Sequence, residues 1–201
     1  MLEDYRDFKR VEKPRKIVAA ISAMCFAASL GLAASVAPTI AKSLDFDEPY
    51  YSTPFAEPGF YNENPLKFSI ETESFSQREI ELIKKAVSEL DEDALGITFE
   101  FCDSSNDADF VFGKAKKGYF ENPFIAGYAT ENNENEKILI SEKFAKFSTQ
   151  ESFKALVKHE VLHILDFDHS HDLSSIMFPI LNAKSLSQKD KELLNALYPE
   201  K

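Results

Sequence analysis

The histidines of this chain are concentrated in one short segment. All four lie between positions 159 and 171, and positions 159–169 read HEVLHILDFDH. Imidazole nitrogens bind divalent metals and exchange protons near neutral pH. Such a concentration therefore indicates a metal site or a proton-transfer site.

The first two of these histidines have the spacing of a metal-binding helix. His159 and His163 are four residues apart, which places both side chains on one helical face, one turn apart. Two neutral imidazoles so placed can bind one zinc ion at about 2.0–2.1 Å each. Glu160 lies beside His159 and can reach a water on that metal without being a ligand. This pattern predicts the helix of a zinc hydrolase.

A catalytic zinc site needs a third protein ligand and keeps its fourth position for water. His169 is the first candidate, and Asp168 is the alternative because carboxylates also bind zinc. In a continuous helix, His169 would lie about 240° around the axis from His163 and would face away. We therefore expect the helix to end near Leu165 and the chain to turn back. Asp166 occupies the position where a left-handed residue, usually glycine, makes such a turn.

A methionine follows at a fixed distance. Met177 lies eight residues after His169 and shortly before Pro179. This spacing predicts a tight turn beneath the metal. The thioether would give the site a soft, apolar floor.

These motifs resemble the metzincin zinc peptidases and, within them, the matrixins, the family of matrix metalloproteinase catalytic domains. The family pattern is HExxHxxGxxH followed by a methionine turn, and Asp166 replaces its glycine here. The segment 186–198 also looks like the matrixin tail, so that the resemblance covers about 64–199. The matching positions are His159, Glu160, His163, His169 and Met177.

The resemblance implies an exported zinc endopeptidase acting on proteins or peptides. The three histidines would bind a single catalytic zinc ion, and Glu160 would act as the general base. The family's substrate-binding edge strand would correspond to Ala126, Gly127, Tyr128 and Ala129. The wall of the pocket for the residue after the cut would come from Pro179, Ile180 and Leu181, although matrixins commonly have an aromatic residue where Leu181 stands.

Two features of many matrixins are not expected here. We find no pro-segment with a metal-blocking cysteine, and no histidine outside 159–171 that could bind a second, structural zinc. The acidic segment 131–136 could bind calcium, but a solvated loop is the simpler interpretation.

Hydrophobic periodicity and capping signals predict an α+β (mixed α/β) domain over 65–201. The metzincin, zincin-like resemblance implies one twisted, mostly parallel sheet with two long helices, an active-site helix and a C-terminal helix after the methionine turn. We expect strands at 66–70, 97–101, 108–112, 125–130 and 138–140. We expect helices that open at the capping pairs Ser76/Glu79, Ser148/Glu151 and Ser187/Asp190, and that stop before Gly96, near Leu165 and near Leu197.

The N-terminal segment 1–41 has the pattern of a targeting sequence. Six basic residues lie within 1–16, and 17–37 carries no charge and is long enough to span a bilayer as a helix of about 30 Å. It is either a signal peptide cut after Ala41 or an uncleaved anchor that holds the protein at the membrane. Residues 42–64 have no clear period and are expected to form a linker. Either alternative places the rest of the chain outside the cytoplasm, secreted or membrane-anchored.

Composition excludes other classes of protein. The chain has 34 acidic and 23 basic residues and a formal net charge of −11, which argues against nucleic-acid binding. Two cysteines cannot form a disulfide scaffold. Two alternative functions stay open: a catalytically inactive zinc-binding surface module, and a zinc amidase that acts on a non-protein link such as one in a cell wall.

Overall fold

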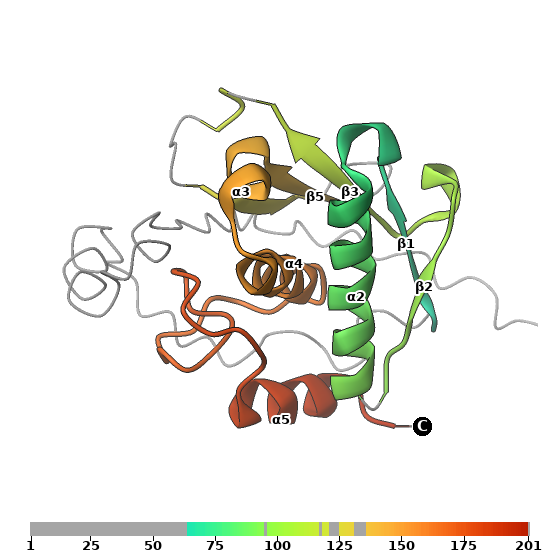
Figure 1. Cartoon of the computed structure of the whole chain (residues 1–201). Helices are drawn as coiled ribbons and strands as arrows, with labels where there is room; N and C mark the ends of the chain where they lie inside the picture. The colour runs from blue at the N-terminus through green and yellow to red at the C-terminus, as the bar shows by residue number, and fades with distance from the viewer. Residues whose placement is uncertain (1–63, 95, 117, 121–124, 131–135, 201) are drawn as a thin grey trace, which may run out of the picture.

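The computed structural model describes residues 64–200 except 95, 117, 121–124 and 131–135 (Figure 1). The expected targeting segment 1–41 and the linker as far as residue 63 lie outside the described residues. So does the acidic loop, except for Glu136. Within the described part of the chain, no helix is both long enough and apolar enough to cross a membrane.

Five strands form a single sheet in the order β2-β1-β3-β5-β4. Neighbouring strands are parallel except for β4, which lies at one edge and runs antiparallel to β5. This confirms the predicted mixed fold with a mostly parallel sheet. The strands are β1 (Leu66–Ile70), β2 (Phe99–Phe101), β3 (Phe110–Ala115), β4 (Gly127–Thr130) and β5 (Glu136–Ser141).

Helix α2 (Gln77–Asp93) begins as predicted. Ser76 and Glu79 form the expected reciprocal capping box. The helix stops before Gly96, as predicted, but Gly96 is not its left-handed cap: the helix ends at Asp93, Ala94 is already extended, and Gly96 does not have a positive φ. Gly96 instead lies under the C-terminal tail, where a side chain would collide with the Tyr198 and Pro199 carbonyl oxygens.

The predicted cap of the active-site helix is wrong by one residue. Thr149, not Ser148, caps α4 (Gln150–Ile164), and its hydroxyl accepts a hydrogen bond from the Ser152 amide. Ser148 instead ends a short helix, α3 (Glu142–Phe147), that the sequence pattern did not predict. Its amide donates to the Phe144 carbonyl, which closes the last turn of α3.

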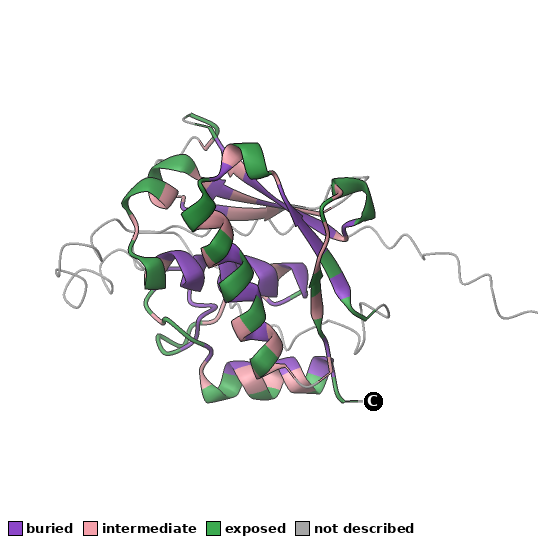
Figure 2. Cartoon of the chain, turned by 45° about the vertical axis from the view of Figure 1, so that its right-hand side comes forward, coloured by how far each residue is buried: buried purple, intermediate pink, exposed green. Residues whose placement is uncertain are grey.

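The remaining elements complete the domain. Helix α5 (Gln188–Leu197) begins at the predicted Ser187/Asp190 capping box and ends where expected. The 3-10 turns η2 (Thr72–Ser74) and η3 (Ser105–Asp107) are too short to give a sequence signal. In Figure 2, α4 is buried along most of its length, whereas α2 and α5 present exposed outer faces.

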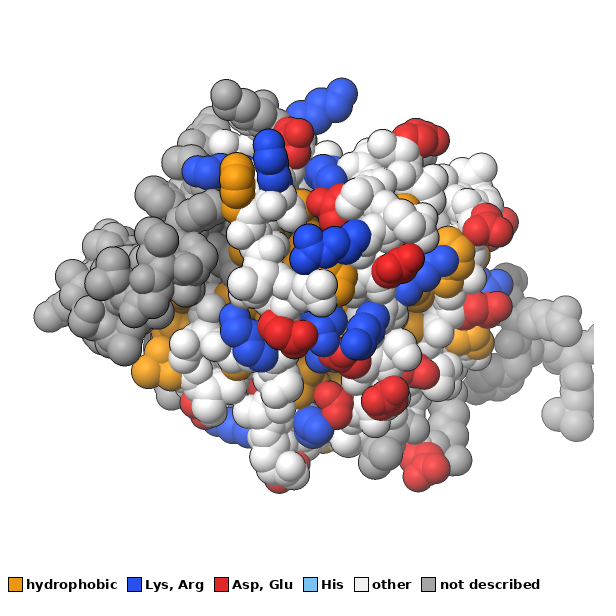
Figure 3. Space-filling view, viewed as in Figure 1, with side chains coloured by type: hydrophobic (Ala, Val, Ile, Leu, Met, Phe, Trp, Pro, Cys, Tyr) orange, Lys and Arg blue, Asp and Glu red, His pale blue; other side chains and the backbone are white. Residues whose placement is uncertain are grey.

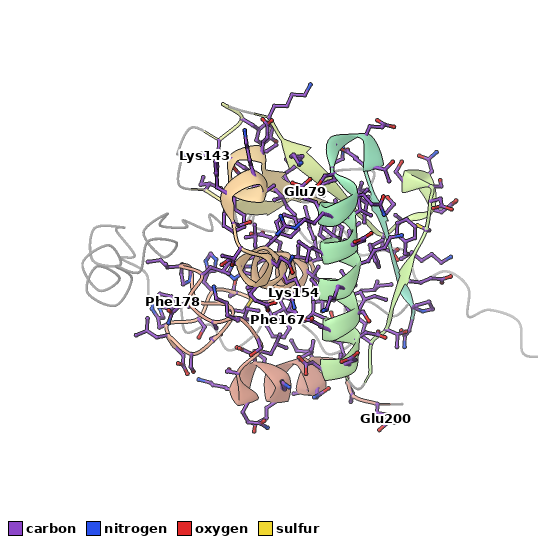
Figure 4. The ribbon with its side chains drawn as sticks, in the orientation of Figure 1. Glu79, Lys143, Lys154, Phe167, Phe178 and Glu200 are labelled. Carbon is purple, nitrogen blue, oxygen red and sulfur yellow. The ribbon has the colours of Figure 1, made fainter. Side chains whose placement is uncertain are left out.

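Helix α4 is buried so completely that even two of its lysines are buried. Lys154 and Lys158 are 7% and 4% exposed, and their ammonium groups lie 2.7 and 2.5 Å from the Glu89 carboxylate on α2. Lys154 lies between α4 and α2 in Figure 4. Basic and acidic side chains are intermixed over this face of the molecule (Figure 3). Because a buried charge is costly without a partner, Glu89 fixes the position of α4 against α2.

Replacing Glu89 with glutamine should therefore destabilise the fold. The Glu89 carboxylate would be lost to both buried ammonium groups, and Lys154 would keep only its pairing with the exposed Glu151 at 3.3 Å. We expect a loss of about 2–3 kcal/mol in the free energy of unfolding, somewhat less than for a fully buried pair. Burial opposes ionisation of Glu89, but hydrogen bonds from Lys154 and Lys158 outweigh it and lower its pKa below 4.5. The contribution is thus present above pH 4.5 and lost as the pH falls below it.

Urea unfolding measures this effect. The matched control is Glu92→Gln, at an exposed position of the same helix, which should change stability by less than about 0.5 kcal/mol. Equal effects of the two substitutions would contradict the role of Glu89.

Candidate metal centre and active site

The structure brings the three predicted histidine ligands together. His159 and His163 lie one turn apart on α4, and His169 comes from the segment that follows the helix. One ligand nitrogen from each ring can be chosen so that all three lie within 4.8 Å of one another. Asp168, the alternative ligand, is not part of this group.

Backbone carbonyls determine which nitrogen of two rings faces the centre. His159 Nδ1 lies 2.7 Å from the Ile176 carbonyl, and His163 Nδ1 lies 2.7 Å from the Phe167 carbonyl. Because a carbonyl oxygen only accepts, each Nδ1 must donate a proton. In a neutral ring, each Nε2 then carries a lone pair, and the two Nε2 atoms face each other at 3.0 Å.

Burial keeps these rings neutral. It lowers the pKa of His159 to about 4 and that of His169 to about 3. The pKa of His163 is lowered well below 6.5, first by burial and then by the two neighbouring histidines. At neutral pH the site therefore offers unprotonated nitrogens, which is the form that binds a metal.

A zinc ion fits this arrangement. The His169 Nε2 atom is buried and has no hydrogen-bond partner, which is costly unless a ligand occupies that position. The 3.0 Å between the other two Nε2 atoms brings two lone pairs together and is close to the about 3.3 Å expected for nitrogens on one tetrahedral ion. A shared cation would satisfy all three nitrogens, and three protein ligands leave a fourth position for water.

The turn that brings back His169 is made as predicted, by a left-handed residue. Asp166 has φ 67°, and it is the residue that follows the helix cap Leu165. The Phe167 amide donates to the Leu162 carbonyl at 3.0 Å, and the Asp166 amide donates to the His163 carbonyl at 3.0 Å. These two bonds are those of a Schellman motif, in which glycine is the usual left-handed residue.

The predicted methionine turn is also present. The Phe178 amide donates to the Ser175 carbonyl at 3.2 Å, so that Ile176 and Met177 occupy the centre of the turn. Met177 is buried, and its carbonyl accepts from the Ser170 amide at 2.9 Å. This bond ties the turn to the residue next to His169. Figure 4 labels Phe178 at the end of the turn.

Asp190 connects this turn to helix α5. Its Oδ1 accepts from the Ser175 hydroxyl at 2.5 Å, and its Oδ2 accepts from the Ile176 amide at 3.0 Å. The Ile176 carbonyl in turn holds His159. Sequence reasoning identified Asp190 only as a helix cap. Its contact with the turn joins residues far apart in the chain, and no local pattern reports it.

Glu160 directly follows His159 on α4. Both of its carboxylate oxygens are buried, and the carboxylate lies against Gly127 at the start of β4. Of the predicted substrate-binding residues, Gly127, Tyr128 and Ala129 lie on this strand, and Ala126 immediately precedes it. Ala126 and Gly127 are buried, whereas Tyr128 and Ala129 are partly exposed.

Strand β4 lies at one edge of the described sheet, as predicted for the substrate-binding strand. Among the described strands it pairs only with β5, for example through Tyr128 and Leu139. Its other side has no strand neighbour in the described sheet. The residues of the predicted pocket wall, Pro179, Ile180 and Leu181, are buried directly after the methionine turn.

The sheet, the histidine-bearing helix, the left-handed turn and the methionine turn define a metzincin catalytic domain. The family model for matrixins matches residues 60–199, and the chain therefore belongs to the matrixin family of zinc metalloproteases. No curated protein matches the chain. Among solved structures, it is similar to high choriolytic enzyme 1, a hatching-enzyme zinc protease from the medaka fish Oryzias latipes. The identity is 15% and the TM-score 0.49, over 77% of this chain and 98% of that one.

The neutral histidines predict how stability depends on pH. Their folded-state pKa values lie below the ordinary 6.5, so that between pH 6.5 and about 4 the unfolded chain binds protons that the folded chain does not. The metal-free protein should therefore lose stability as the pH falls from 7 to 5, by up to about 1.4 kcal/mol per pH unit for each histidine.

Urea unfolding of the metal-free protein at pH 7, 6 and 5 checks this. His169→Asn should make the slope shallower. A wild-type profile without any slope would show that the cluster is not buried as described.

Asp166→Gly tests the turn. Glycine adopts positive φ without the steric penalty of a Cβ atom, so that the variant should fold with unchanged or slightly higher stability, by up to about 1 kcal/mol. Asp166→Val should destabilise, because a β-branched residue is strained there. Thermal unfolding of both variants is the measurement, and a collapse of the glycine variant would show that Asp166 makes contacts the fold requires.

Proposed function

We propose that this matrixin is an exported endopeptidase in which Glu160 is the general base and His159, His163 and His169 hold one catalytic zinc ion. The observation that carries the proposal is the convergence of three neutral histidines, with the buried carboxylate of Glu160 on the residue next to His159. When bound, zinc would lower the pKa of a water toward about 7 and polarise the scissile carbonyl.

The protein's own groups complete the reaction. Glu160 accepts the proton of the attacking water as the new carbon–oxygen bond forms, and it later delivers that proton to the leaving amine as the carbon–nitrogen bond breaks. No covalent intermediate with the protein is needed. The carbonyls of Ile176 and Phe167 keep two histidine rings in the required orientation throughout.

The substrate would bind as an extended strand along β4. Backbone hydrogen bonds to residues 127–130 would supply affinity with little demand on sequence. Pro179, Ile180 and Leu181 would form the wall of the pocket for the residue after the cut. Their apolar side chains favour an apolar substrate residue at that position.

We also propose that the catalytic domain acts outside the cytoplasm. The support is the sequence of 1–41, where basic residues precede the uncharged run 17–37. The same run would serve as a membrane anchor if it is not removed.

Glu160→Ala should abolish hydrolysis and leave zinc binding intact, because the carboxylate handles protons and is not a ligand. We expect kcat to fall by at least about 10²–10⁴-fold, the usual contribution of a general base. The zinc-loaded full-length protein would be incubated with a proteome-derived peptide library, and mass spectrometry would identify the cut sites. Competition with a chromophoric chelator would measure zinc affinity.

Two controls make the result specific. A chelator should abolish every cut made by the wild type, and Glu142→Ala, at an exposed position on α3, should cut normally. Full activity of the zinc-loaded Glu160→Ala protein would refute the assigned role. A folded, zinc-loaded wild type that makes no cuts would instead favour the cell-wall amidase or the inactive binding module.

A further inference from the structure

Gly127 leaves no room for a side chain beside Glu160. A Cβ atom at position 127 would lie 2.6 Å from Glu160 Oε1, 2.9 Å from Cδ and 3.0 Å from Cγ. Contacts below 3.0 Å essentially never occur for real Cβ atoms. The carboxylate therefore occupies the space that a side chain on β4 would fill.

Backbone conformation does not explain this glycine. Gly127 lies in a regular strand, and the glycine with positive φ among the described residues is Gly118. Any residue could adopt the backbone of Gly127 without strain. What the position excludes is the volume of a side chain, and the atoms that exclude it belong to Glu160.

Comparison with Gly96 shows which atoms would move if Gly127 carried a side chain. At Gly96, a side chain would strike backbone atoms of Tyr198 and Pro199, which cannot move without displacing the tail. At Gly127, it would strike the far end of a flexible side chain. Substitution at Gly127 should therefore leave the fold in place and displace the Glu160 carboxylate.

We propose that Gly127 is a positioning residue, whose missing side chain sets where the Glu160 carboxylate lies beside the three histidines. This inference rests on the proposed function, in which Glu160 is the general base. Helix α4 fixes the Glu160 backbone next to His159. The position of the carboxylate then depends on the space that β4 leaves at Gly127. The same strand would then position both the base and the substrate.

Gly127→Ala tests the proposal by kinetics. A base misplaced by about 1 Å can cost about 10²-fold in rate, and we expect kcat to fall by about 10–100-fold. KM should change by less than about twofold, because an alanine keeps the backbone hydrogen bonds of β4. Zinc affinity, measured by chelator competition, should also stay within about twofold.

The chain offers a matched control in the same sheet. A Cβ atom at Gly113 on β3 would lie 2.8 Å from Glu71 Oε2 and 3.2 Å from Leu139 Cδ2. Gly113→Ala therefore also crowds a carboxylate, but one outside the candidate active site. It should leave kcat unchanged within about twofold.

The conservative variant Glu160→Asp provides a rescue. Its side chain is shorter by one methylene, so that it lacks the Oε1 and Cδ atoms that lie 2.6 and 2.9 Å from the Cβ position of residue 127. In the Glu160→Asp background, Gly127→Ala should cost less than about threefold in kcat, compared with about 10–100-fold when Glu160 is present. An equal cost in the two backgrounds would mean that Gly127 does not act through the carboxylate.

Thermal unfolding of the metal-free protein gives a readout that needs no activity. Gly127→Ala should lower Tm by about 2–4 °C in the wild type. In the Glu160→Ala background it should leave Tm unchanged or raise it, because the collision is removed and alanine restricts the unfolded chain.

The outcomes separate the two proposals. A wild type without peptidase activity overturns the proposed function, and the unfolding measurements still decide whether Gly127 and Glu160 are coupled. An active wild type with the same kcat in the Gly127→Ala and Gly113→Ala variants overturns the positioning role. So does a Tm change that is the same with and without Glu160.

Discussion

The reversal of the chain at Asp166 is the constraint on which the candidate site depends. Two histidines share a face of α4 by helical geometry alone, but His169 reaches them only because the helix ends in a left-handed turn. The amide of Phe167 closes that turn, and the carbonyl of Phe167 holds His163. Asp166 thus redirects the chain, and Phe167 both closes the turn and orients a ligand. The local backbone and the metal site cannot be altered independently.

Groups outside the cluster hold the buried histidines in place. A neutral, oriented imidazole needs a fixed acceptor for its Nδ1 proton, and for His159 that acceptor is the Ile176 carbonyl. The Asp190 carboxylate accepts a hydrogen bond from the amide of the same residue, Ile176, so that the cap of α5 reaches the metal site through one turn. On the other side of α4, Glu89 compensates two buried lysines. The ligands are therefore held by α2, α4 and α5 together.

Features that depend on residues close together in the sequence could be predicted, whereas contacts between distant segments could not. The spacing of His159 and His163 and the left-handed turn at Asp166 depend on helix geometry within a few residues, and both were predicted. The cap of α4 was misplaced because Ser148 and Thr149 are both competent caps, and the choice depends on where α3 ends. The contacts of Asp190 and Gly127 join distant segments, and no periodicity or motif could report them.

The edge strand connects these observations to catalysis. An enzyme that binds an extended chain needs an open strand edge close to its base, but a strand carries a side chain toward the helix at every second residue. At Gly127 that side chain is missing, and the buried carboxylate of Glu160 fills the space. The open edge and the buried base can therefore be neighbours without separating the strand from α4. Under the proposed function, this close approach would let one short strand, β4, serve both the substrate and the proton-transferring group.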